Sequence, residues 1–201
     1  GRDLRAGHRP GRTGPGAAGR GARGPRGGSS RSRRTSRSAR SSALCLKLLL
    51  QQQPVARDLR QISAALKMIT DMERIGDQAA DIAEIIPFFL SHNTFDCTLV
   101  CRMAQQASSM VTQSVDAFVR RDVYLARSVA GQDDLVDEDF TAVKQALIAA
   151  IAREPGQGEV ALDLLMIAKY FERIGDHAVN LSEWVEFSVT GVHKHDGVEY
   201  E

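Results

Sequence analysis

Two segments of this chain, 99 residues apart, repeat one pattern. Residues 72–84 read MERIGDQAADIAE, and residues 171–183 read FERIGDHAVNLSE. Both contain the core Glu-Arg-Ile-Gly-Asp, and apolar residues flank that core at matching places. An internal repeat at a fixed offset indicates two copies of one structural unit. The sequence therefore predicts a fold built from two related halves.

Each copy of the repeat has the pattern of an amphipathic helix with an acidic side. Residues on the acidic side are Glu73, Asp77, Asp81 and Glu84 in the first copy, and Glu172, Asp176, Asn180 and Glu183 in the second. A glycine stands at the edge of the apolar side in both copies, as Gly76 and Gly175. Glycine inside a helix costs about 0.5–1 kcal/mol relative to alanine. Its presence in both copies predicts a close approach of another helix or of a ligand.

Carboxylates four residues apart on a helix can hold one cation together or bridge a pair of cations, because their Cβ atoms lie roughly 5–6 Å apart. Carboxylate oxygens suit cations such as magnesium, manganese or iron. A merely solvated acidic surface is the alternative, since Arg74 lies within ion-pair reach of Asp71 and Asp77. A ferritin-type di-iron site is disfavoured because its Glu-x-x-His spacing is absent. His177 follows Glu172 by five residues and is interpreted as a surface or cap residue.

The residues around the repeat resemble the phosphate uptake regulator (PhoU) family. Residues 44–60 resemble the approach to the first signature helix of that family, and Met68–Asp77 and Ala168–His177 resemble its two signature helices. Ser114–Asp122 and Asp133–Asp137 fit its intervening helices. The resemblance covers about residues 44–190 and includes several motifs in the expected order.

The resemblance implies an all-α fold of two pseudo-repeated three-helix bundles, a homodimer, and metal clusters on carboxylate-rich faces. Members of the family restrain phosphate-starvation signalling by acting between a phosphate ABC transporter and a sensor histidine kinase. We therefore expect a cytoplasmic regulator that is peripheral to the membrane only through these partners. The metal is expected to be iron, manganese, magnesium or zinc.

The predicted metal ligands come from both copies. In the second copy, Glu172 and Asp176 are expected to face Asp134 and Asp137 across a helix pair, because those two aspartates share one face of the preceding helix. The complete set of predicted metal ligands is Glu73, Asp77, Asp81, Asp134, Asp137, Glu172 and Asp176.

The N-terminal segment, residues 1–43, departs from the family pattern. It holds 12 Arg, 10 Gly and 7 Ser but one acid, whereas the rest of the chain has 14 Lys plus Arg against 24 Asp plus Glu. We expect it to be disordered, because it has no apolar periodicity with which to offset its ordering entropy. The counterparts of Asp134 and Asp137 in this segment are Thr35 and Ser38, so the first repeat should lack its N-terminal helices and bind metal more weakly.

The origin of the N-terminal segment has three interpretations. An abrupt change in composition next to an intact leucine-rich helix favours a shifted reading frame. A basic nucleic-acid-binding arm and a targeting peptide are the alternatives. The acidic remainder of the chain argues against nucleic acid as a partner.

Helical patterning continues through the rest of the chain. Pro87 is expected to kink or end the helix that contains it. The predicted helices cover about residues 44–52, 55–90, 97–121, 122–130, 132–153 and 159–189. The predicted units are residues 1–43 as a tail, 44–92 as the remainder of the first repeat, 93–190 as the second repeat and 191–201 as a polar tail. No apolar run reaches the ~18 residues of a membrane span.

No catalytic constellation is visible, since the chain has no Ser-His-Asp order, Walker loop or dinucleotide-binding glycine motif. Cys97 and Cys101 could share a metal, but cysteines without Cys-x-x-Cys spacing are more typical of reduced thiols. We expect no enzymatic activity. The alternative functions are a metal-dependent enzyme that uses the same carboxylates and a nucleic-acid-binding protein that uses the basic arm.

Overall fold

The computed structural model describes residues 28–51, 56–92 and 95–192. These residues form helices and their connections, and none of them lies in a β-strand. The helices are α1 (Gly28–Gln51), α2 (Ala56–His92), α3 (Thr98–Arg120), α4 (Val123–Ala130), α5 (Asp133–Arg153) and α6 (Gly158–Thr190), with a short 3-10 turn, η1 (Pro155–Gln157), before α6. The all-α prediction is confirmed.

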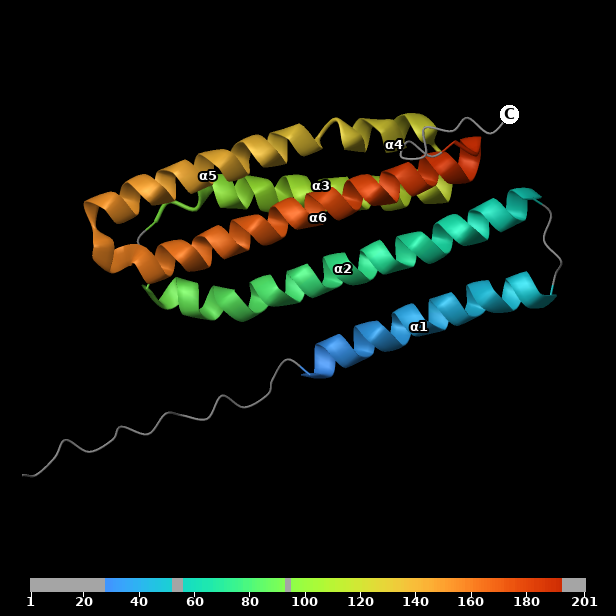
Figure 1. Ribbon diagram of the computed structural model, residues 1–201, viewed down its shortest axis with the longest axis horizontal. Coiled ribbons are helices and arrows are strands. Elements are labelled where there is room, and N and C mark those ends of the chain that lie inside the picture. The colour runs from blue at the N-terminus through green and yellow to red at the C-terminus, as the bar shows by residue number, and fades with distance from the viewer. Residues whose placement is uncertain (1–27, 52–55, 93–94, 193–201) are drawn as a thin grey trace, which may run out of the picture.

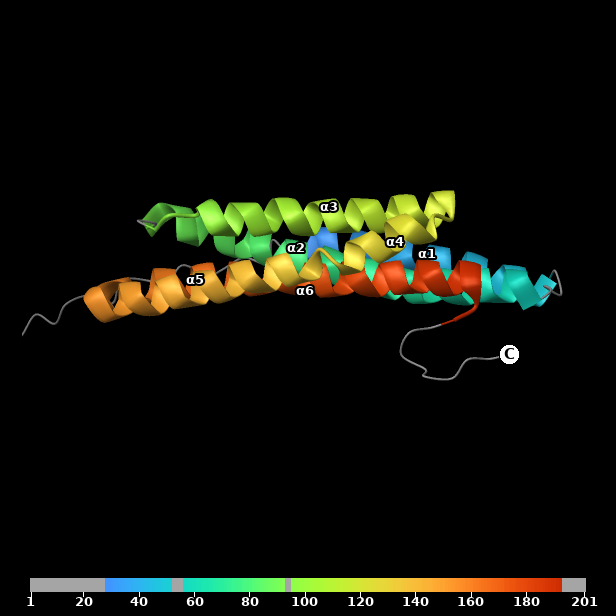
Figure 2. The same cartoon turned by 90° about the horizontal axis from the view of Figure 1, so that it is seen from above.

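Four long helices lie side by side in the order α1, α2, α6 and α5 (Figure 1). Helix α3 lies on one face of this layer, over α5 and α6, with α4 beside its C-terminal end (Figure 2). In the sequence repeat, the offset of 99 residues makes α5 the counterpart of α1 and α6 the counterpart of α2. The two halves of the sequence repeat therefore correspond to the helix pairs α1–α2 and α5–α6.

Apolar side chains between the helices form the core. Where α2 meets α6, Met68 packs with Leu181 and Val185, and α3 and α4 add Ala117 and Ala126. A larger cluster lies between α3, α5 and α6 and includes the fully buried Met103, Met110 and Val136. These contacts fix which side of α6 carries its acidic residues.

The structure corrects the prediction of disorder over residues 1–43. Residues 28–43 belong to α1, which continues into the leucine-rich segment and packs along α2. The physical reason lies in the sequence, because residues 28–43 contain no proline and one glycine, whereas residues 1–27 contain three prolines and nine glycines. Residues 1–27 lie outside the described residues, as do residues 193–201 of the expected polar tail.

The alternative in which the helix ends at Pro87 is also corrected. Helix α2 continues through Pro87 and ends at His92. Proline removes one backbone N–H donor from a helix. The loss falls in the last turns of a 37-residue helix, where Phe89 remains buried in the core. Packing of the helix end therefore outweighs the local penalty.

Candidate metal centre

Five carboxylates gather where the N-terminal half of α5 lies beside the middle of α6. We define the α5–α6 acid cluster as Asp133, Asp134, Asp137, Glu172 and Asp176. Asp133 and Asp134 lie in the first turn of α5, where acidic side chains interact favourably with the positive end of the helix dipole. The α6 members are positioned by the opposite side of that helix, on which Ile174 and Ala178 are buried.

The carboxylates of the cluster act on one another. Burial raises the pKa of Asp133 to about 6, and the negative charges of Asp176 and Asp137 add to that rise. Burial likewise raises the pKa of Asp137, and the charge of Glu172 raises it further. The pKa of Asp176 is raised by burial and then by Glu172 and Asp137. The cluster therefore concentrates negative charge, and the raised pKa values reduce that charge only in part.

One ammonium group lies within the cluster. Lys169 forms an ion pair with Glu172, one turn along α6. Its Nζ also lies 5.1 Å from the ring centre of Phe140 on α5. Burial and the neighbouring carboxylates raise the pKa of Asp137 and of Asp176, and the Lys169 charge opposes that rise without cancelling it.

Gly175 explains how α5 and α6 come so close. A Cβ atom at this position would lie 3.0 Å from Asp133 Oδ1, and 3.8 Å from both Met110 Cε and Val136 Cγ1. The close helix–helix approach predicted from the repeated glycine is therefore confirmed at Gly175. Sequence reasoning did not select Asp133 as a site residue. The available signal was its spacing of four residues from Asp137, which puts both on one helix face.

The first repeat has a weaker version of this arrangement. Ser38 Oγ on α1 donates a hydrogen bond of 2.8 Å to Glu73 Oε2 on α2. Ser38 is the counterpart of Asp137, and Glu73 is the counterpart of Glu172. A hydroxyl therefore stands where the second repeat has a carboxylate. Asp77 and Asp81 lie partly buried along α2.

A polar contact joins the two repeats. His177 Nδ1 on α6 lies 2.9 Å from Asp71 Oδ1 on α2, and Asn180 Nδ2 donates to the same oxygen at 3.4 Å. The interpretation of His177 as a surface or cap residue is therefore wrong. Its partner lies 106 residues away in the chain, so helical spacing alone could not reveal the contact.

The α5–α6 acid cluster offers only carboxylate oxygens, the donor type that hard divalent cations prefer. Within the described residues, no three or more His, Cys, Asp or Glu side chains are arranged so that they could hold a metal ion without rearrangement. Magnesium commonly retains several waters and uses one or two carboxylates. An open hollow of about 500 Å³ on α5 is lined by Asp134 and Asp137 of the cluster and by Glu138 and Thr141. A cation held there would reduce the mutual repulsion of these carboxylates.

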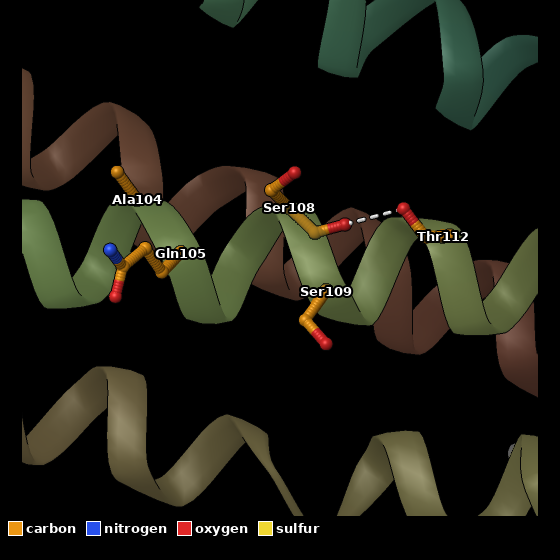
Figure 3. A pocket seen from close by; sticks show the side chains of 5 residues that line it. All are labelled: Ala104, Gln105, Ser108, Ser109 and Thr112. Carbon is orange, nitrogen blue, oxygen red and sulfur yellow. Dashed lines mark hydrogen bonds between the residues drawn. The ribbon is translucent and has the colours of Figure 1, made fainter.

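A second hollow lies on the outer side of α3 and has different chemistry. Its lining consists of Ala104, Gln105, Ser108, Ser109 and Thr112 (Figure 3). Thr112 Oγ1 donates a 2.9 Å hydrogen bond to the Ser108 carbonyl oxygen, as the dashed line in Figure 3 shows. No ionisable side chain lines this hollow. It is therefore a poorer candidate for a cation site than the α5–α6 acid cluster.

The raised pKa of Asp133 predicts a pH dependence of stability. The folded state holds this proton more tightly than the unfolded chain, in which the pKa is near 3.8. The resulting stabilisation is present at low pH and is lost as the pH rises through about 6. In chelator-treated buffer, Asp133→Asn should raise the urea midpoint of unfolding at pH 7.5, and the gain should shrink toward pH 5.

The control for this measurement is Glu84→Gln, at an exposed position of α2. This variant should follow the wild type at both pH values. An Asp133→Asn gain that is equal at pH 5 and pH 7.5 would contradict the assignment of the raised pKa.

None of the described helices is long and apolar enough to cross a membrane.

Comparison with known proteins adds an independent finding. The PhoU domain profile matches residues 37–86 and 100–185. A phosphate-specific transport system accessory protein PhoU homolog from Clostridium acetobutylicum is 34% identical over 148 residues, which is 73% of this chain and 68% of that protein. A homolog of the same name from Pseudomonas aeruginosa is 34% identical over 149 residues, or 73% of this chain and 62% of that protein.

Solved structures agree with these matches. The crystal structure of PhoU from Pseudomonas aeruginosa aligns with a TM-score of 0.77 and 30% identity, covering 81% of this chain and 78% of that one. The phosphate transport system regulatory protein PhoU from Streptococcus pneumoniae aligns with a TM-score of 0.73, over 81% of this chain and 76% of that one. At 24% identity, the second match supports the fold alone.

Proposed function

This chain belongs to the PhoU domain family, and on that premise we propose that it regulates phosphate transport and binds divalent cations at its α5–α6 acid cluster. The name of its relatives, phosphate-specific transport system accessory protein PhoU homolog, supports the transport role. The matched region spans 62–68% of the length of the two relatives described above. The regulation of phosphate transport is therefore a proposal for this chain.

The observation that carries the cation proposal is the gathering of carboxylates from α5 and α6 at one place, close enough for each to feel the charge of the others. Carboxylates that repel one another at close range are stabilised by a cation between them. Asp133, Asp137, Glu172 and Asp176 would hold the ion, and the cation would supply positive charge that neutralises them. Magnesium and manganese suit a site of oxygen donors with room for water.

The first repeat should bind the cation more weakly. Ser38 offers a neutral hydroxyl to Glu73, whereas Asp137 offers a second negative charge to Glu172. Affinity for a hard cation rises with the number of charged ligands. The carboxylates Glu73, Asp77 and Asp81 therefore form the weaker of two related sites.

The proposed partners are a phosphate ABC transporter and a sensor histidine kinase. The chain would act from the cytoplasmic side, as a homodimer, and would damp both phosphate uptake and phosphate-starvation signalling. No reaction is assigned to it. Its activity consists of docking through helical surfaces whose charge depends on bound cation.

Complementation tests the function. A Pseudomonas aeruginosa strain deleted for its own PhoU homolog would express this chain, and initial phosphate uptake and a phosphate-starvation reporter would be measured. Wild-type chain should lower both signals, while Glu172→Ala/Asp176→Ala at equal expression should lower them less. Leu162→Ala, at an exposed site on α6, is the matched control. If folded wild-type chain leaves both signals at the level of the deleted strain, the proposed function is wrong.

A further inference from the structure

A pair of thiols lies at the start of α3, and neither belongs to the α5–α6 acid cluster. Cys97 is the N-cap residue of this helix, and Cys101 follows one turn later. The Cys101 N–H donates a 2.8 Å hydrogen bond to the Cys97 carbonyl oxygen, so the two residues stand at helical spacing. Residues four apart on a helix have Cβ atoms roughly 5–6 Å apart. One ion placed between the two sulfur atoms could therefore contact both.

The two thiols share one hollow on the surface of the molecule. Cys97 is partly buried, packs against the core cluster between α3, α5 and α6, and donates a 3.6 Å hydrogen bond to the Phe95 carbonyl oxygen. Cys101 is exposed. Packing therefore holds one thiol in place, while the other is open to an incoming ion. The residues that line this open hollow of about 540 Å³ are Asp96, Cys97, Thr98, Cys101, Arg102 and Gln105.

The charged side chains around the hollow favour a cation over an anion. The Thr98 hydroxyl and backbone N–H donate hydrogen bonds of 2.6 Å and 2.9 Å to Asp96 Oδ1. These hydrogen bonds lower the pKa of Asp96, so its carboxylate is ionised at neutral pH. The neighbouring Arg102 guanidinium is engaged in a two-point ion pair with Asp139, whose side chain is buried. The hollow is therefore left with the negative charge of Asp96.

The sulfur donors select a soft cation that needs few ligands. Thiolate sulfur prefers soft ions such as Cu(I) and also binds zinc. Structural zinc takes four ligands, but in the part of the chain that the structure describes no three His, Cys, Asp or Glu side chains are arranged around one ion. Cu(I) is satisfied by two thiolates in a nearly linear arrangement. Two thiols on one helical turn therefore suit Cu(I) better than zinc.

We propose that Cys97 and Cys101 form a binding site for Cu(I), chemically distinct from the α5–α6 acid cluster. On binding, each thiol loses its proton to solvent and each sulfur forms a bond to the ion. The resulting unit of one Cu(I) and two thiolates carries one negative charge, which the positive end of the α3 dipole favours. The chain thus offers oxygen ligands to hard cations at one place and sulfur ligands to a soft cation at another. This site does not depend on the proposed regulation of phosphate transport.

Competition with bicinchoninate for Cu(I) tests the site, using reduced full-length chain under argon and the colour of the bicinchoninate complex as the readout. Wild-type chain should take up one Cu(I) per chain. Cys101→Ser removes one of two ligands, so it should weaken uptake by more than the roughly 10–100-fold that changes outside a ligand shell cost. Cys97→Ser should have the same effect. Cys45→Ser is the matched control, because this third cysteine lies on α1, and it should bind as the wild type does.

Cys101 is exposed, so Cys101→Ser should keep the circular dichroism of the wild type, which separates loss of binding from loss of folding. Glu172→Ala/Asp176→Ala should take up Cu(I) as the wild type does, since both thiols remain. Copper X-ray absorption of the loaded wild type should show sulfur as the direct neighbour of the ion. Equal uptake by Cys101→Ser and wild type, or one ion held between two chains in native mass spectrometry, would overturn the proposal.

Discussion

Replacing Leu181 with alanine is expected to lower the free energy of unfolding by about 2–5 kcal/mol. Leu181 is fully buried and packs with Met68 of α2 and with Val185 of its own helix. Truncation removes apolar contacts and leaves a cavity at the junction of the two repeats, where surrounding helices can relax only partly. The measurement is urea unfolding followed by circular dichroism at 222 nm.

Leu162→Ala is the matched control, because Leu162 lies on α6 but is exposed. Its effect should stay within about 0.5 kcal/mol. Equal losses for the two variants would mean that the α2–α6 junction contributes no more to stability than the surface does. Such a result would contradict the description of the two repeats as one packed core.

Local signals in the sequence were enough to place most helices of the second repeat. The short helix predicted over residues 122–130 is α4, Val123–Ala130, because Asp122 caps it by accepting a 3.0 Å hydrogen bond from the Leu125 N–H. The helix predicted over 132–153 is α5, Asp133–Arg153, which the Pro-Gly segment after it ends. Caps and breakers act within a few residues and can be read from the sequence.

The start of α1 could not be predicted in the same way. Its arginines and serines have no apolar period, so its helical state depends on packing along α2 and on contacts such as that of Ser38 with Glu73. Tertiary contacts of this kind outweigh intrinsic propensity. The helix continuing past Pro87 has the same explanation.

The candidate site was predicted in part. Spacing of four residues placed Glu172 and Asp176 on one side of their helix, and the structure brings them near Asp137. The roles of Asp133 and Lys169 depend on how closely α5 approaches α6, which Gly175 sets. The contact of His177 with Asp71 depends on the packing of the two repeats. Residues that meet only through packing leave no local signal.

Glu172→Ala/Asp176→Ala is expected to abolish most cation binding by the second repeat. The double variant removes both α6 carboxylates, so only α5 carboxylates remain to hold the ion. Even changes outside the ligand shell typically reduce metal affinity by roughly 10–100-fold, and the loss here should exceed that range. Helix α6 should remain folded in this variant, because its buried side consists of other residues, including Ile174, Ala178 and Leu181.

Lys169→Met provides a variant with the opposite expected effect. The Lys169 ammonium pairs with Glu172 and competes with a bound cation for that carboxylate. Its removal should tighten manganese binding in a titration followed by electron paramagnetic resonance. Lys144→Met, at an exposed position of α5, should bind as the wild type does.

Elemental analysis of protein purified without added metal or chelator tests the central claim most directly. Wild-type chain should carry manganese, magnesium, iron or zinc in a defined ratio to protein. Glu172→Ala/Asp176→Ala should have lost most of that metal while its helical circular dichroism matches the wild type. Equal metal content in the two proteins would contradict the assignment of the α5–α6 acid cluster as the cation site of this chain.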